Sequence, residues 1–320
     1  MRIVREIAAL ALVLLTGDGG GPVAHYARTV TRSDIGIVVA PPLAEPVPTA
    51  AEPQDQPPLP AAEQPAGLDR AIERHLGVAL LHIPKGFRTD RCDLVIHFHG
   101  AASTYEPQFD AAQTGAALLL INAGIQSGPY ETRFADAHGL DRALIVAQKG
   151  LDDALGASQC KIGRVALSAW SAGYGAVLKI LAHKSNVERI DAVLLADGMH
   201  AGYRPKSTSE VDPIGMAPFT RFASEAAFGN KLMSVTHSTV VTQPHASTKE
   251  TAAFLIQATS MTRRTVESTG PRNMVMTYRA DLRGMHVKGF EGGDAAAHSD
   301  HLYNFGELLL GDLRDRWQTI

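Results

Sequence analysis

The sequence predicts an α/β fold: a three-layer domain with a mostly parallel central sheet, preceded by a signal-like segment and a Pro-rich linker. Short apolar runs rich in Val, Leu and Ile alternate with longer stretches of helical periodicity. The runs are continuously apolar, as expected for parallel strands that are buried on both faces. Polar residues follow several of these runs directly, where the catalytic groups of such sheets collect.

The N-terminal part of the chain is expected to lie outside this domain. Residues 1–25 have a basic start and a short apolar run from Ile7 to Leu15, which is the layout of a secretory signal. The run is shorter than the roughly 20 residues of a spanning helix, although an uncleaved segment would tether the protein to a membrane. Residues 26–67 form a low-complexity Pro/Ala-rich linker, with nine of the 18 prolines between Ala40 and Gly67. We therefore expect a secreted, periplasmic or cell-surface protein with one catalytic domain at 68–320.

The elements predicted for this domain alternate along the chain, with no internal repeat. Predicted strands cover 78–83, 93–98, 116–121, 164–168, 190–196 and 233–241, and a β-rich region covers 273–290. Predicted helices cover 134–149, 172–182, 219–228, 248–259 and 301–317. This alternation is the pattern of a parallel sheet with helices on both faces.

One serine lies in a pattern typical of a nucleophile. Ser171 stands between a predicted strand and a predicted helix, with the small residues Ala169 and Gly173 two positions before and after it. Such a strand–turn–helix elbow is too tight for larger side chains at these positions, and it lifts the hydroxyl clear of the sheet. Because the helix begins beside the hydroxyl, the backbone N–H of Ala172 is expected to stabilise an oxyanion.

The nucleophile elbow of the α/β-hydrolase superfamily resembles Ala169-Trp170-Ser171-Ala172-Gly173, except that Ala169 replaces the usual first glycine. A second segment, His97-Phe98-His99-Gly100, resembles the His-Gly segment that follows the third strand in this superfamily. The order of elements also resembles that fold from 78 to 317. The resemblance implies that Ser171 is the nucleophile and that the N–H of Ala101 is the second oxyanion donor.

The superfamily places its catalytic base near the end of the chain, where this sequence has three histidines. His286 lies in a predicted strand and is expected to be structural. His298 is predicted to lie in the loop before the final helix, which Ser299 or Asp300 would cap. The resemblance favours His298 as the base, and His301, expected in the first helical turn, is the alternative.

A carboxylate is needed to orient the base. The superfamily most often places it after a later strand, but no Asp or Glu lies between Lys231 and Lys249. Asp197 follows the strand at 190–196 and is the available carboxylate, although it would also suit an ordinary turn. The order Ser171, Asp197, His298 matches nucleophile, acid and base.

Composition excludes some partners and predicts a disulfide. The net charge is −3 with no run of Lys and Arg among aromatics, which argues against nucleic acid. Cys92 and Cys160 fit no metal or haem spacing. They precede two strands that are parallel neighbours in the hydrolase sheet, so we expect them to form a disulfide. The motifs imply no cofactor and no metal, and the expected partner is a small-molecule or acylated substrate.

These observations predict a serine hydrolase, most specifically a carboxylic ester hydrolase of the esterase or lipase kind. One alternative is a metal-dependent hydrolase, since His97 and His99 would lie on one face of a strand and H-x-H can bind zinc, with Asp197 and His200 as supplements. A second is a catalytically inert binding module with the same fold. The segment 199–231 is long enough to cap the serine, with an apolar lining of Met199, Tyr203, Met216, Phe219 and Phe222.

Overall fold

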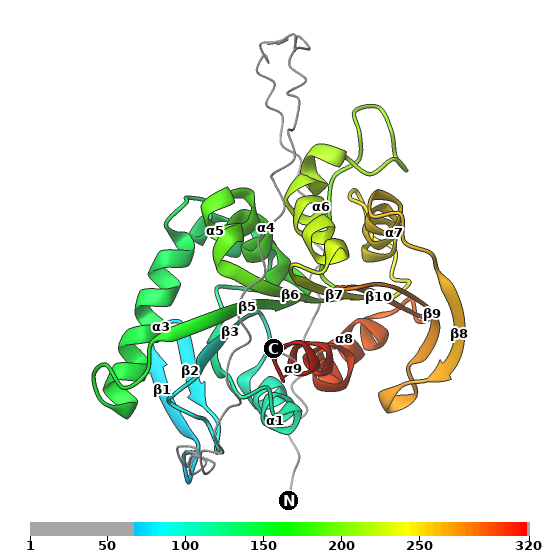
Figure 1. Ribbon diagram of the computed structural model, residues 1–320. Coiled ribbons are helices and arrows are strands. Elements are labelled where there is room, and N and C mark those ends of the chain that lie inside the picture. The colour runs from blue at the N-terminus through cyan, green and yellow to red at the C-terminus, as the bar shows by residue number, and fades with distance from the viewer. Residues whose placement is uncertain (1–66, 319–320) are drawn as a thin grey trace, which may run out of the picture. The chain divides into compact units, whose positions relative to one another are not determined.

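The computed structural model describes residues 67–318 (Figure 1). The signal-like segment 1–25 and nearly all of the linker 26–67 lie outside the described residues. The strands are β1 (Ile72–Leu76), β2 (Ala79–Ile83), β3 (Cys92–Phe98), β4 (Ala117–Ile121), β5 (Ile162–Trp170), β6 (Ile190–Ala196), β7 (Leu232–His237), β8 (Arg264–Thr269), β9 (Val275–Leu282) and β10 (Met285–Phe290). They form one ten-stranded sheet in the order β1-β2-β4-β3-β5-β6-β7-β10-β9-β8.

Helices cover both faces of this sheet. They are α1 (Ala102–Ala112), α2 (Ser127–Arg133), α3 (Gly139–Leu155), α4 (Tyr174–Ala182), α5 (Lys184–Arg189), α6 (Pro213–Phe228), α7 (Thr248–Ala258), α8 (Ala295–Tyr303) and α9 (Gly311–Gln318), with short turns η1 (Ser171–Gly173), η2 (Pro271–Asn273) and η3 (Gly306–Leu310). Figure 1 shows α1, α8 and α9 on one face and α4 to α7 on the other. Each face has its own apolar core. The predicted three-layer α/β-hydrolase fold is confirmed.

The parallel part of the sheet brings the candidate residues to one edge. β3, β4, β5, β6, β7 and β10 run parallel, whereas β1 and β2 at one end and β9 and β8 at the other are antiparallel. Ala169 of β5 is in register with Phe98 of β3 and with Leu195 of β6. The residues that follow these three positions therefore emerge beside one another at the carboxyl edge.

Several elements were not predicted, for identifiable reasons. β1 reads Ile-Glu-Arg-His-Leu because it is an edge strand with mostly exposed side chains. Helix α1 contains Pro107, whose missing N–H makes a helix improbable from sequence. The helix predicted at 134–149 corresponds to α3, which begins five residues later and runs on to Leu155, whereas α2 was not predicted. The final predicted helix is α8, the π-helical turn η3 and α9.

The predicted disulfide between Cys92 and Cys160 is confirmed, with Cα atoms 5.7 Å apart. Cys92 opens β3 and is in register with Ile162 of the neighbouring β5, two residues after Cys160. The bridge therefore joins adjacent parallel strands at the edge opposite the candidate site. Between residues 67 and 318, no helix has both the length and the apolar character needed to cross a bilayer.

Candidate active site

Ser171 lies in a strained turn between β5 and α4. Its φ is 48°, in the left-handed region that residues other than glycine seldom occupy. A Cβ at Gly173 would lie 2.1 Å from the carbonyl oxygen of Phe98, so no larger residue fits there. Ala169, two positions before the serine, is fully buried in β5. The backbone around Ser171 therefore requires glycine at position 173, and the buried position 169 is filled by alanine.

A second tight turn follows β6 and contacts the first. Asp197 also has a left-handed φ, 41°, and a Cβ at Gly198 would lie 2.5 Å from the backbone nitrogen of Ser171. The Asp-Gly pair is thus more than an ordinary turn, because its glycine lets the two loops touch. This contact sets the position of the Asp197 carboxylate relative to the serine.

Three side chains from separate elements form one chain of hydrogen bonds. The Oγ of Ser171 lies 2.8 Å from Nε2 of His298. The other ring nitrogen, Nδ1, lies 2.7 Å from Oδ2 of Asp197. The Asp197 side chain is 1% exposed and that of His298 is 15% exposed. The ring therefore links a buried carboxylate to a partly exposed hydroxyl, which is the arrangement needed to remove a proton from the hydroxyl.

The Asp197 carboxylate is held in its charged form. Its Oδ1 accepts hydrogen bonds from the backbone N–H of Ser238, at 2.8 Å, and from the hydroxyl of Thr248. Burial by itself would raise the pKa of Asp197, but the hydrogen bond from His298, the nearby charges of His301 and His298 and the Ser238 N–H together hold it well below its usual range. Asp197 is thus a permanent acceptor for the Nδ1 proton of His298.

The surroundings of His298 differ from those predicted. His298 lies in the first turn of α8 rather than in a loop, and Asp294, not Ser299 or Asp300, caps that helix by accepting from the N–H of Ala297. Three consecutive alanines at 295–297 have no helical periodicity, so the sequence did not indicate that the helix begins there. The indole N–H of Trp170 donates to the His298 carbonyl, and the indole stacks on its ring.

His301, the alternative base, has Thr236 rather than the serine as its hydrogen-bond partner. It lies two residues from the end of α8 rather than in its first turn, and it is fully buried. Its Nδ1 lies 2.8 Å from the hydroxyl of Thr236, and burial lowers its pKa to about 4. His298, not His301, is the histidine within hydrogen-bond distance of Ser171.

The two residues predicted to supply the oxyanion N–H groups both lie at the start of a helical segment. Ala172 is the second residue of η1, where the first N–H groups have no intrahelical acceptor. Ala101 is the N-cap residue of α1. Asn122, directly after β4, clamps the preceding residue: its Oδ1 accepts from Gly100 N–H at 3.1 Å and its Nδ2 donates to Gly100 O at 2.8 Å. In a trans peptide the N–H points opposite to the C=O, so the clamp also fixes the direction of the Ala101 N–H.

Sequence reasoning missed Asn122, Trp170 and Gly198 as parts of this site. For Asn122 a signal existed, since it is a polar residue at the end of an apolar parallel strand. Trp170 lies at the position of the elbow motif that accepts any residue, so the motif gives it no role. The role of Gly198 depends on a contact between distant loops, which no local pattern shows.

The expectation that His97 and His99 lie on one strand face is wrong. β3 ends at Phe98, and His99 has a φ of 71°. His97 stacks on Tyr105, and its two nitrogens face Ser168 Oγ at 2.8 Å and the His99 carbonyl at 2.9 Å. Burial lowers the pKa of His97 to about 3 and that of His99 to about 4. Both nitrogens of His97 therefore have partners, and the pair does not form the zinc ligands of the alternative reading.

The residues expected to line a cap occupy other positions. Four of them are completely buried in the core between the sheet and its helices: Met199, Met216, Phe219 and Phe222. Tyr203 donates a hydrogen bond to Glu250 of α7. The idea that 199–231 covers the serine stays a prediction, and these side chains do not argue for it.

No protein-family model matches the chain, and no curated protein matches it. Among solved structures it is similar to LpqC, a poly(3-hydroxybutyrate) depolymerase from Bordetella parapertussis, with 13% identity, a TM-score of 0.43 and coverage of 72% of this chain and 83% of that one. It is also similar to the siderophore hydrolase EstA from Aspergillus nidulans, with 14% identity, a TM-score of 0.41 and coverage of 84% and 99%. A third similar structure is a cold-adapted esterase from an Arctic intertidal metagenomic library, with 9% identity, a TM-score of 0.38 and coverage of 75% of this chain and 92% of that one. At this level of similarity the neighbours' substrates say nothing about the substrate of this chain.

Proposed function

We propose that this protein is a serine hydrolase that cleaves carboxylic esters through an acyl-enzyme intermediate on Ser171. One observation carries the proposal: His298 connects the Ser171 hydroxyl to the buried Asp197 carboxylate by hydrogen bonds of 2.8 and 2.7 Å. A serine hydroxyl is a weak nucleophile until a base takes its proton, and an oriented imidazole at this distance is such a base.

In the proposed reaction, the Ser171 oxygen attacks the ester carbonyl carbon while its proton passes to Nε2 of His298. The carbonyl oxygen becomes an oxyanion that accepts hydrogen bonds from the N–H groups of Ala172 and Ala101. The carbon–oxygen bond to the alcohol then breaks, and the imidazolium gives its proton to the departing alkoxide. Water repeats the sequence on the acyl-enzyme, which releases the acid and restores the serine.

Asp197 and Trp170 act through His298. Asp197 accepts the Nδ1 proton, so Nε2 faces the serine as the basic nitrogen, and its charge stabilises the imidazolium. The stack of the Trp170 indole on the imidazole, with ring centroids 4.9 Å apart, restricts ring rotation. Both residues keep the base in one tautomer and one orientation.

The assignment of base and acid is tested by turnover of p-nitrophenyl acetate and butyrate. His298→Ala is expected to lower kcat by about 10⁴-fold or more, since removing a triad member has effects of this size. His301→Ala is the matched control within the same helix, and its folded fraction should keep the activity. If His298→Ala hydrolyses the esters and folded His301→Ala does not, the base is misassigned.

A chelator and a fluorophosphonate probe distinguish the two alternatives. A metal-dependent hydrolase would lose activity with a chelator and would not react with a fluorophosphonate, whereas a serine hydrolase shows the reverse. An inert binding module would neither turn over esters nor take up the probe. Comparison of p-nitrophenyl esters of rising chain length with a peptide anilide separates esterase, lipase and peptidase activity.

We also propose that the chain is exported from the cytoplasm. The Cys92–Cys160 disulfide supports this, because such bonds persist mainly in oxidising compartments. Expression of the full chain in a bacterium, followed by fractionation and N-terminal sequencing, tests it. Protein found only in the cytoplasm with an intact N-terminus contradicts the proposal.

A further inference from the structure

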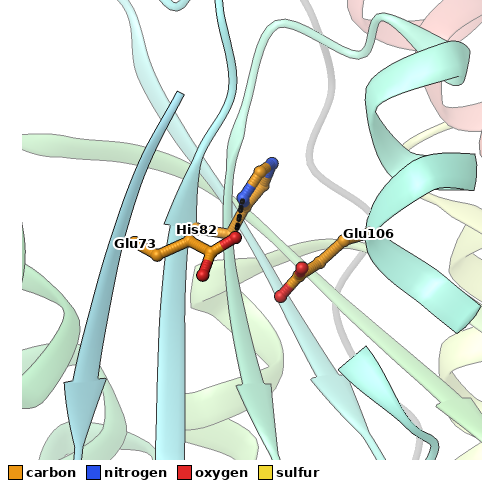
Figure 2. Close-up of side chains that lie close together, drawn as sticks. All are labelled: Glu73, His82 and Glu106. Atoms are coloured by element: carbon orange, nitrogen blue, oxygen red, sulfur yellow. Dashed lines mark ion pairs between the residues drawn. The ribbon is translucent and has the colours of Figure 1, made fainter. Parts of the chain in front are cut away.

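A second cluster of polar side chains lies away from Ser171, where β1, β2 and α1 meet (Figure 2). Glu73 of β1 and His82 of β2 are directly opposite each other in the antiparallel pair. Glu106 projects towards them from α1. One nitrogen of His82 and one oxygen from each carboxylate all lie within 4.8 Å of one another.

His82 is the residue that sets this cluster apart from an ordinary acidic patch. It is 3% exposed, and its Nε2 lies 2.7 Å from Oδ1 of Asp110, one helical turn after Glu106. When Asp110 accepts the Nε2 proton, Nδ1 carries the lone pair. That nitrogen is buried without a hydrogen-bond partner and is 4.0 Å from the nearest oxygen of Glu73. A histidine oriented by a carboxylate, with its other nitrogen turned to further carboxylates, is the usual arrangement of a metal ligand.

Glu106 also has a polar atom that lacks a hydrogen-bond partner. Its Oε1 is buried and has no hydrogen-bond partner, which is costly for a carboxylate. A bound cation would supply the partner that Oε1 of Glu106 and Nδ1 of His82 both lack.

We propose that Glu73, His82 and Glu106 bind a divalent cation of the zinc type, with Asp110 as the positioning residue for the histidine. One imidazole nitrogen and two carboxylate oxygens suit Zn²⁺, which completes its coordination with water. A tetrahedral ion at about 2.1 Å from each ligand holds ligand atoms about 3.4 Å apart. The three ligand atoms lie within 4.8 Å of one another, so side-chain movement, for which the exposed Glu73 has room, would bring them to that distance. The ion would tie the edge strand β1 to α1, the helix that begins directly after Ala101.

The test is calorimetric titration of ZnCl₂ into the full chain, purified without a histidine tag and freed of metal with EDTA. We expect one Zn²⁺ per chain. Glu73→Gln and Glu106→Gln should each weaken binding at least about tenfold, and Asp110→Asn by about 10- to 100-fold. Glu267→Gln is the matched control, because Glu267 is also an exposed glutamate in an edge strand, β8. Its affinity should equal that of the unmodified chain.

Thermal unfolding supplies a readout that does not depend on hydrolysis. Zn²⁺ should raise the melting temperature of the unmodified chain and of Glu267→Gln by several degrees, and that of Glu73→Gln by clearly less at the same Zn²⁺ concentration. Absence of saturable Zn²⁺ binding up to about 1 mM overturns the proposal. So does binding that Glu73→Gln and Glu106→Gln leave unchanged. Glu106 would then instead keep a proton and share it with Glu73.

Discussion

Removal of the Asn122 side chain should lower the rate of ester hydrolysis without unfolding the protein. Asn122 makes two hydrogen bonds to Gly100 and thereby fixes the peptide that carries the Ala101 N–H. Each such bond contributes about 1 kcal/mol, so Asn122→Ala loses up to about 2 kcal/mol of preference for this orientation. If the oxyanion needs the Ala101 donor, kcat falls by up to about 30-fold.

The expected signature is a lower kcat with nearly the same KM, because the Ala101 N–H acts on the oxyanion rather than on the ground-state ester. The assay is turnover of p-nitrophenyl butyrate together with the melting temperature. Asn230→Ala is the control: Asn230 is an exposed asparagine with a hydrogen bond to Glu225, and it precedes β7 at the opposite edge of the sheet. A kcat within about twofold of the unmodified value for Asn122→Ala refutes the role given to the clamp.

Two further predictions concern stability. Replacing Cys92 and Cys160 by serine should lower the free energy of unfolding by up to about 4 kcal/mol, because the bridge spans 68 residues. The folded variant should keep its kcat. A urea midpoint equal to that of the unmodified protein contradicts this prediction. Acid should also destabilise the fold, because burial lowers the pKa of six histidines, four of them from 6.5 to about 3 or 4, while the unfolded chain protonates normally. Below pH 6.5 the unfolded state therefore binds more protons, and the urea midpoint should fall steadily towards pH 4; a flat profile contradicts this. The four residues are His97 (about 3), His99, His200 and His301 (about 4).

The buried parallel strands could be predicted because each one is a continuous apolar run in the local sequence. β6 reads Ile-Asp-Ala-Val-Leu-Leu-Ala and was predicted with its observed bounds, since a strand covered on both faces has to be apolar throughout. β1 and β8 are edge strands, so their exposed residues carry no such pattern. Helix α1 was hidden by Pro107.

The candidate site could be predicted only where chemistry depends on a short motif. The elbow signals Ser171 because backbone sterics restrict residues on either side of the serine. Asp197 was selected because no Asp or Glu lies between Lys231 and Lys249, and His298 because it lies near the end of the chain. The Asn122 clamp, the Gly198 contact and the metal-type cluster at His82 join segments that are far apart in sequence. Their residues look ordinary until the sheet brings them together.

The central claim is that Ser171 forms the covalent intermediate. The most direct test is intact-mass spectrometry of the protein after treatment with a fluorophosphonate, followed by peptide mapping. We predict one adduct per chain on the peptide that contains Ser171, and neither adduct nor ester hydrolysis for a folded Ser171→Ala variant. An adduct on another residue, or near-normal hydrolysis by Ser171→Ala, contradicts the account.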